Sequence, residues 1–177
     1  MSRVDAATRL TEALRLTSPD LLRYLQRRLG IDDAADALAE LMLAAWRRVD
    51  ALPSSDEQSR MWLFGIARNV VANADRSERR RLTLTGKFRD ALRAAPLDVR
   101  SADDGADVRD AIARLSQEQA ELVRLIHWDG FSVAEAGALL SVSASTARSR
   151  YQRARADLRK MLSLCEAEAE AEVGARN

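Results

Sequence analysis

The stretch FSVAEAGALLSVSASTARSRYQRAR, residues 131–155, decides the fold of the carboxyl-terminal part of the chain. Ser132 and Glu135 are three residues apart, which is the spacing of a capping box at the start of a short helix. A serine-rich turn follows, and Ser143 is placed to cap a second helix. Because Gly137 lies in the first helix, the two helices can cross closely. Together these features predict a helix-turn-helix.

The second of these helices has two chemically different faces. Its apolar residues recur at intervals of four, three and four, as a buried stripe requires: Ala147, Tyr151, Ala154 and Leu158. The opposite side is polar and basic, and residues 144–156 contain no acid. A solvated helix more often mixes acidic with basic residues, so a structural hairpin with a basic face is the less favoured alternative.

The chemistry of the polar face favours DNA. Arginine binds the acceptor edge of guanine with two hydrogen bonds, and glutamine does the same for adenine. Hydroxyl groups and a helix amino terminus suit phosphate oxygens. We therefore expect this helix to lie in the major groove of DNA. The residues expected to contact DNA are Ser143, Ser145, Thr146, Arg148, Ser149, Gln152 and Arg153.

The amino-terminal half shows helical periodicity as well. Helices are expected over residues 4–16, 21–29, 33–49 and 61–76. Pro19 and Asp20 separate the first two of these helices, Gly30 ends the second, and Asp32 caps the third. Their complementary apolar stripes predict one helical bundle.

Residues 82–106 differ in character, because glycines, a proline and a polar run predict a linker, with a short helix near 88–94. Beyond it, Ser116 and Gln119 repeat the capping-box spacing. The expected fold is therefore all-α, with two small helical domains joined by a linker, the second a four-helix domain containing the helix-turn-helix. The expected parts are a bundle over 1–81, a linker over 82–106, a four-helix domain over 107–164 and an acidic tail over 165–177.

Charge is distributed unevenly, although the formal net charge is only +1. Six basic residues and one acid lie from Arg148 to Lys160, and four basic residues and one acid lie from Arg76 to Arg81. Two separate basic stretches suit a protein that touches a polyanion at two places. Solvated helix faces would give the same pattern, so charge alone does not decide between them.

The sequence disfavours several kinds of site and location. The lone Cys165 allows no internal disulfide, and together with His127 it is too little for a four-ligand zinc site. The chain has no Gly-rich phosphate loop and no nucleophile–base pair, so we expect neither an enzyme nor a cofactor. No apolar run approaches the ~20 residues of a membrane span, and no secretion signal opens the chain. A cytoplasmic protein without membrane insertion or metal is expected.

Two sets of residues carry a resemblance to a known family. In the carboxyl-terminal half they are Leu125–Ser132, Ala134–Glu135, Val142–Ser143, Thr146–Arg150 and Arg153–Arg155. In the amino-terminal half they are Tyr24–Leu25, Arg28–Gly30, Asp33–Ala34, Asp36, Glu40, Ala45–Trp46, Trp62–Phe64 and Ile66–Asn69. In order and spacing both sets resemble bacterial sigma factors of the extracytoplasmic-function (ECF) group, within the sigma-70 family. Response regulators carry only a module similar to the first set.

The resemblance implies a subunit of the RNA polymerase holoenzyme rather than an enzyme. In that family the amino-terminal domain docks on the clamp of the polymerase core and opens the −10 promoter element. The carboxyl-terminal domain reads the −35 element and touches the flap, and an anti-sigma protein commonly covers the same surfaces. The partners we expect are therefore polymerase core, promoter DNA and an anti-sigma factor.

The resemblance also assigns surfaces in the amino-terminal half. Polymerase binding is implied on the helix after Asp32, whose outer face presents Asp36, Glu40, Leu43 and Arg47. An outward leucine beside two acids suits a protein partner, although a single exposed leucine is common. Contact with the −10 element is expected through amide and cationic groups that suit the DNA backbone: Arg60, Arg68, Asn69, Asn73, Arg76, Arg79 and Arg80.

The segment 54–60 occupies the place where the family captures a base extruded from the non-template strand. Capture of this kind offsets the cost of unstacking the base. The carboxylates of Asp56 and Glu57 do not reveal which base is accepted. We expect Trp46 and Trp62 to pack in the core rather than to stack on bases.

The chain departs from the family pattern at a few positions. Ala35, Ala37 and Ala39 stand where polar groups are usual, and this predicts weaker polymerase docking. Ser141 stands in the turn where glycine is common, which suggests an altered −35 preference. The acidic tail is expected to be a solvated helix end.

Two functions are compatible with this sequence. The first is a sigma factor that directs polymerase to promoters and initiates transcription by −35 recognition and −10 melting. The alternative is a stand-alone helix-turn-helix transcriptional regulator with an amino-terminal dimerisation or sensing bundle. Recruitment to core polymerase separates the two.

Overall fold

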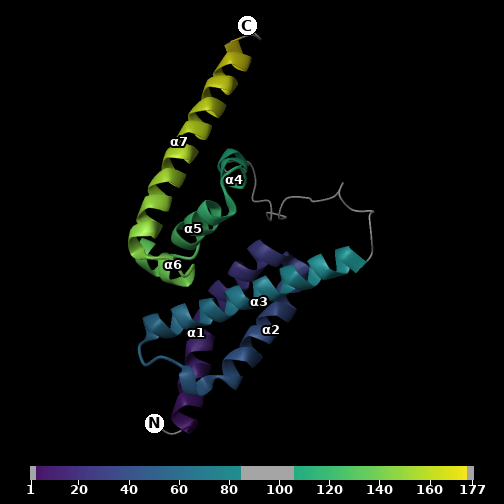
Figure 1. Ribbon diagram of the computed structural model, residues 1–177, viewed down its shortest axis with the longest axis vertical. Helices are drawn as coiled ribbons and strands as arrows, with labels where there is room; N and C mark the ends of the chain where they lie inside the picture. Colours follow the sequence, from purple (N-terminus) through teal and green to yellow (C-terminus); the bar gives the residue numbers. More distant parts are fainter. Residues whose placement is uncertain (1–2, 85–105, 175–177) are drawn as a thin grey trace. The chain divides into compact units, whose positions relative to one another are not determined.

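The computed structural model describes residues 3–84 and 106–174, and every regular element in these two ranges is helical (Figure 1). The chain forms two compact units, residues 1–99 and 100–177. The first contains α1 (Arg3–Leu29), α2 (Ile31–Arg47), the 3-10 turn η1 (Val49–Ala51) and α3 (Asp56–Leu84). The second contains α4 (Ala106–Ala113), α5 (Gln117–His127), α6 (Val133–Leu139) and α7 (Ala144–Gly174). The all-α, two-domain expectation is confirmed.

In the first unit, α1, α2 and α3 pack against one another around an apolar core (Figure 1). Its largest fully buried side chains are Leu10, Leu21, Tyr24, Leu25, Leu41, Leu63 and Phe64. The Tyr24 and Phe64 rings meet edge to face, with 5.3 Å between their centroids. Because burial of each such side chain stabilises by about 1.5–3 kcal/mol, this core fixes which faces of α2 and α3 point outward.

The expected break between residues 16 and 21 is wrong, because α1 continues through Pro19 as one helix. The buried side chains of Leu14, Thr17 and Leu21 form one stripe on both sides of the proline. The Thr17 hydroxyl donates to the Ala13 carbonyl at 2.6 Å, within the turn that precedes Pro19. A proline inside a helix costs about 3 kcal/mol, and burial of a stripe that spans it outweighs this cost.

Two other expected boundaries are also wrong. The residue that precedes α2 is Gly30, whose φ of 88° lies in the left-handed region that favours glycine. Asp32 lies in the first turn of α2 instead of capping it, where its charge still favours the helix amino terminus. Helix α3 spans Asp56–Leu84 and is longer at both ends than the expected helix 61–76, so the connection before it is only residues 52–55 and its last residues lie within the expected linker 82–106.

In the second unit, local capping signals place the helices where the sequence predicts them. Ser116 and Gln119 form a reciprocal capping box at α5, and Ser132 and Glu135 form another at α6. The hydroxyl of Ser143 accepts from the Thr146 N–H at 3.1 Å at the start of α7, as expected. These three predictions are confirmed because each depends only on residues three apart.

The buried stripe predicted on α7 is also confirmed. Ala147 and Ala154 are fully buried, and Ala154 joins the core with Ile112, Leu115, Ala120 and Val123. Tyr151 and Leu158 are half-buried and pack against that core. The expected short helix near 88–94 lies outside the described residues, as do the side chains of the expected acidic tail.

Candidate nucleic-acid interface

The polar face of α7 is open to solvent. Ser145, Arg148, Ser149, Gln152 and Arg153 are exposed, and Thr146 is half-buried. They lie opposite the buried alanines of the same helix, so the fold leaves this face available. Arg148 and Gln152, one turn apart, can donate to base edges, while the serine hydroxyls beside them reach phosphate.

The Ser143 side chain also forms hydrogen bonds at the beginning of α7. Its hydroxyl oxygen lies 2.9 Å from Ser145 Oγ and 2.8 Å from Thr146 Oγ1, in addition to accepting from the Thr146 N–H. The three hydroxyls therefore form a cluster at the amino terminus of α7. Such a terminus favours an anion, which suits a DNA phosphate.

Polar contacts from α5 hold α7 in place. Arg150 Nη1 lies 2.9 Å from Glu118 Oε2, and Gln119 Nε2 donates to Asp157 Oδ2 at 2.9 Å. Arg150 is half-buried, so its charge is directed to α5 rather than to the polar face. This leaves the face itself to Arg148, Gln152 and their neighbours.

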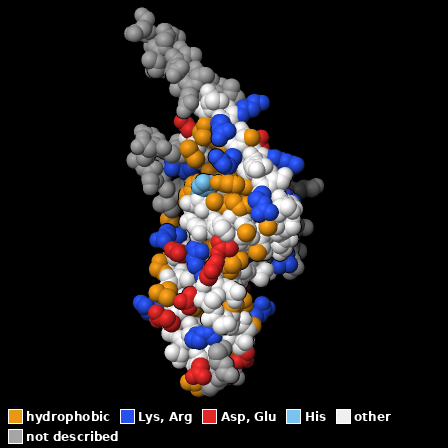
Figure 2. Space-filling model, turned by 90° about the vertical axis from the view of Figure 1, so that its left-hand side faces the viewer, with side chains coloured by type: hydrophobic (Ala, Val, Ile, Leu, Met, Phe, Trp, Pro, Cys, Tyr) orange, Lys and Arg blue, Asp and Glu red, His pale blue; other side chains and the backbone are white. Residues whose placement is uncertain are grey.

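An aromatic patch lies at the junction of α5 and α7, and the sequence did not predict it. His127 Nε2 lies 2.9 Å from the Tyr151 hydroxyl, and the two ring centroids are 6.0 Å apart. Trp128 packs edge to face on His127 and is 46% exposed. Figure 2 shows the histidine against hydrophobic side chains on the surface. The adjacent pair His127–Trp128 at a helix end was the signal in the sequence, since two exposed rings there suggest a partner.

The outer face of α3 presents most of the residues expected at the −10 element. Asn69, Asn73, Arg76 and Arg79 are exposed and Arg68 is half-buried. Arg76 Nη2 donates to Asn73 Oδ1 at 2.6 Å, so cation and amide form one polar surface. The Arg80 side chain lies outside the described residues.

Arg60 does not join this face. It precedes Asn69 by nine residues, which places it about 180° around the helix. Its guanidinium lies 3.9 Å from Asp20 Oδ2 of α1 and 5.0 Å from the Phe64 ring centroid. Arg60 therefore braces α3 against α1.

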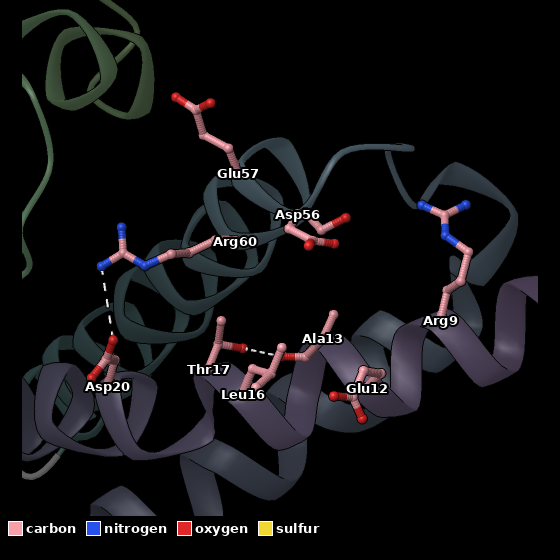
Figure 3. A pocket seen from close by; sticks show the side chains of 10 residues that line it. Arg9, Glu12, Ala13, Leu16, Thr17, Asp20, Asp56, Glu57 and Arg60 are labelled. Carbon is pink, nitrogen blue, oxygen red and sulfur yellow. Dashed lines mark hydrogen bonds and ion pairs between the residues drawn. The ribbon is translucent and has the colours of Figure 1, made fainter.

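A pocket of about 490 Å³ lies between α1 and the beginning of α3 (Figure 3). It is lined by Arg9, Glu12, Ala13, Leu16, Thr17, Asp20, Asp56, Glu57, Ser59 and Arg60. The Arg15 guanidinium, hydrogen-bonded to Glu12 at 2.7 and 2.9 Å, holds the pKa of the Glu12 carboxyl below its ordinary value. Four carboxylates against two guanidinium groups make this pocket a poor place for DNA phosphate.

The outer face of α2 is partly apolar. Asp36, Glu40 and Arg47 are exposed, and Leu43 is 58% exposed. Trp46 is 42% exposed, so the expectation that it packs in the core is wrong. An exposed leucine and tryptophan on one helix are typical of an interaction surface.

Two further positions clarify this surface. Trp62, which was also expected in the core, is half-buried. Ala35 and Ala39 are exposed, whereas Ala37 is buried. The missing polar group at Ala37 therefore concerns packing of α2 and has no direct bearing on docking.

In the part of the chain that the structure describes, no three His, Cys, Asp or Glu side chains are grouped so that they could hold a metal ion. Among the described helices, none is long and apolar enough to cross a membrane.

Comparison with known proteins matches both units. The family described as Sigma-70 region 2 matches residues 14–81, and the family described as Sigma-70, region 4 matches residues 106–158. The ECF RNA polymerase sigma factor SigL of Mycobacterium tuberculosis is 30% identical over 170 residues, covering 92% of this chain and 96% of SigL. The ECF RNA polymerase sigma factor SigC of the same organism is 32% identical over 145 residues, covering 80% and 77%.

A solved structure is similar over both units. It is the sigma factor RpoE in complex with the anti-sigma factor NepR from Bartonella quintana. The TM-score is 0.65 and the sequence identity is 29%, and the match covers 86% of this chain and 96% of that one.

Proposed function

The chain belongs to the extracytoplasmic-function sigma factors of RNA polymerase, and we propose which of its surfaces perform each step of transcription initiation. A sigma factor directs polymerase core to specific promoters. It acts by binding polymerase and DNA and not by catalysing a reaction of its own. A stand-alone regulator is not favoured, because the region 2 match covers residues that such a regulator does not need. The proposed parts are a core- and −10-binding domain over 1–81, a linker over 82–106, a −35-binding domain over 107–164 and an acidic tail over 165–177.

The polar face of α7 is proposed to read the −35 element. The observation that carries this assignment is an exposed, acid-free face on a helix that is held from behind by α5. Arg148 and Gln152, one turn apart, are assigned to paired hydrogen bonds with bases. The hydroxyl cluster at Ser143, Ser145 and Thr146 is assigned to a phosphate, with Ser149 and Arg153 beside it.

The outer face of α3 is proposed to contact the −10 element. Arg68, Asn69, Asn73, Arg76 and Arg79 supply amide and cationic groups on one side of the helix, and Arg80 follows in the sequence. Arg60 is left out of this set, since it faces α1 and Asp20. The extruded base is assigned to the connection 52–55 and the first turn of α3.

The outer face of α2 is proposed to dock on the polymerase clamp. Asp36, Glu40, Leu43 and Arg47 were expected there, and the exposure of Trp46 adds a large apolar contact. The aromatic patch of the second unit, with Trp128 exposed, is assigned to a second polymerase contact at the flap. Aromatic side chains carry much of the energy in protein interfaces.

An anti-sigma factor is proposed as a further partner. The similar sigma factor RpoE is solved in complex with the anti-sigma factor NepR. The exposed apolar face of α2 gives such a partner a surface whose covering would block polymerase. The protein is proposed to act in the cytoplasm, where polymerase and promoter DNA are present.

Transcription from a promoter library tests these assignments. Core polymerase with this protein should enrich promoters that share one −35 and one −10 sequence, above core polymerase alone. Arg148→Ala should relax the −35 sequence only, and Asn69→Ala should affect the −10 sequence only. No enrichment above core polymerase alone would contradict the function itself.

A further inference from the structure

The connection between η1 and α3, residues 52–55, is fixed from two sides. The carbonyl oxygen of Pro53 accepts one hydrogen bond from Arg9 Nη2 and another from Ser59 Oγ at 3.0 Å. The Ser59 N–H also donates to the Ser55 carbonyl at 2.9 Å, and the Ser59 side chain is buried. Both ends of this short connection are therefore tied to neighbouring helices.

Arg9 is the long-range member of this arrangement. It lies in α1, 44 residues before Pro53 in the sequence, and reaches the connection from one end of the α1–α3 pocket (Figure 3). At the other end, Arg60 pairs with Asp20. Arg9 thus contacts the connection before α3 at one end of the pocket, and Arg60 of α3 contacts α1 at the other.

The Pro53 carbonyl needs only one hydrogen-bond donor, and water supplies such donors to an exposed connection. The two protein donors therefore do more than satisfy this carbonyl. A second donor that is charged makes the stronger bond and restricts the connection further. A receptor that is ordered before its ligand arrives binds more tightly, because ordering the receptor no longer opposes binding. The double contact therefore favours a connection with a preformed shape.

We propose that Arg9 is a positioning residue for promoter opening, which acts with Ser59 to hold residues 52–55 ready for an extruded base. The inference rests on the proposed function, in which this connection and the first turn of α3 capture that base. Arg9 contacts the connection through the Pro53 carbonyl, and the proposal assigns it no direct contact with DNA. Its loss should therefore slow opening of duplex DNA and leave recognition of the −35 element unchanged.

The test uses a promoter recovered from the library, core polymerase and the full-length protein. Permanganate reactivity of thymines reports how much of the −10 element is single-stranded. Arg9→Ala should open the duplex promoter about three- to tenfold less than wild type, the effect of one hydrogen bond. On the same promoter with a pre-opened mismatched −10 bubble, whose thymines react in any case, the transcript yields with Arg9→Ala and wild type should differ by less than about twofold.

Three variants sharpen the test. Arg15→Ala changes an exposed arginine of the same helix that pairs with Glu12, and it should open duplex promoter like wild type. Arg9→Lys keeps a charged donor and should recover much of the opening. Ser59→Ala removes the other donor to Pro53 and should impair opening in the same direction as Arg9→Ala.

The outcomes are separable. Wild type that opens no promoter contradicts the proposed function, whatever the variants do. If wild type opens the duplex and Arg9→Ala opens it equally, the positioning role is overturned. The role is also overturned if Arg9→Ala loses as much on the bubble as on the duplex, or if it binds core polymerase less tightly. Either result would mark Arg9 as a general structural residue.

Discussion

Replacing Gly137 by alanine tests whether the close approach of α6 and α7 sets the geometry of the helix-turn-helix. An ideal Cβ at position 137 would stand 2.8 Å from Ala147 Cβ and 3.4 Å from the Val142 carbonyl oxygen. Neither atom belongs to a flexible side chain, so the two helices must separate. Overpacking of this kind costs about 1–3 kcal/mol, and the better helix propensity of alanine offsets about 1 kcal/mol. We expect a net loss of about 1 kcal/mol from the free energy of unfolding of the second unit.

The assay must report the second unit alone, because the two units need not unfold together. Trp46→Phe and Trp62→Phe leave Trp128 as the only tryptophan, and it lies in that unit. Urea unfolding followed by Trp128 fluorescence then gives the stability of wild type and Gly137→Ala in one background. Binding of a −35 duplex should weaken as well, since the displaced α7 carries the reading face.

A matched glycine-to-alanine change without a steric clash serves as a control for the loss of stability in Gly137→Ala. Gly65→Ala in α3 meets nothing within 4 Å of its new Cβ, so it should stabilise the first unit by about 0.5–1 kcal/mol and leave the unfolding transition reported by Trp128 unchanged. Ala147→Gly removes the methyl group that Gly137→Ala would strike, and it should restore −35 binding when the two are combined. A Gly137→Ala protein that is as stable as wild type and binds DNA equally well would refute the reasoning.

The remaining predictions concern three of the four proposed surfaces: the α7 face, the α2 face and the aromatic patch. Arg148→Ala should cost about 1–3 kcal/mol of site-specific DNA binding and relax the base preference at one position of the −35 element. The control Arg159→Ala, farther along the same helix, should leave that preference unchanged. An equal loss of affinity on every sequence would make Arg148 a phosphate contact. Leu43→Asp should weaken association with core polymerase, measured by gel shift or interferometry, at an unchanged melting temperature, and unfolding would instead place Leu43 in the core. Trp128→Ala should reduce transcription with polymerase while the isolated protein binds −35 DNA as before, and weaker binding by the isolated protein would contradict this assignment.

The parts of the fold that depend on neighbouring residues could be predicted from the sequence. The capping boxes at Ser116 and Ser132 are contained in four residues each, so no distant contact can overrule them cheaply. Pro19 shows the opposite case. Its local preference ends a helix, but the stripe that includes Leu14 and Leu21 is buried against other helices, and that burial is decided by the whole bundle.

The candidate sites also divide into those that local sequence predicts and those that depend on contacts between distant residues. The exposed face of α7 follows from periodicity alone, since a buried stripe fixes the direction of everything opposite it. Arg60 was expected at the −10 element as a cationic group of the segment 54–60, but its side chain contacts Asp20, which belongs to another helix. The contact between Arg9 and Pro53 joins residues 44 apart and leaves no mark in any local pattern.

The energy that the reading face can supply indicates how much the chain depends on polymerase. Of its exposed residues, Arg148 and Gln152 are the two proposed to form paired contacts with bases, each worth about 1–3 kcal/mol of discrimination. Their sum of about 2–6 kcal/mol falls at the low end of the ~4–10 kcal/mol that separates specific from non-specific sites in DNA-binding proteins. A second contact on the same DNA would close this difference, because tethering two weak contacts raises their joint affinity without new groups. The α3 face is the proposed second contact, and polymerase bound at Leu43, Trp46 and the aromatic patch would hold both domains at the required spacing.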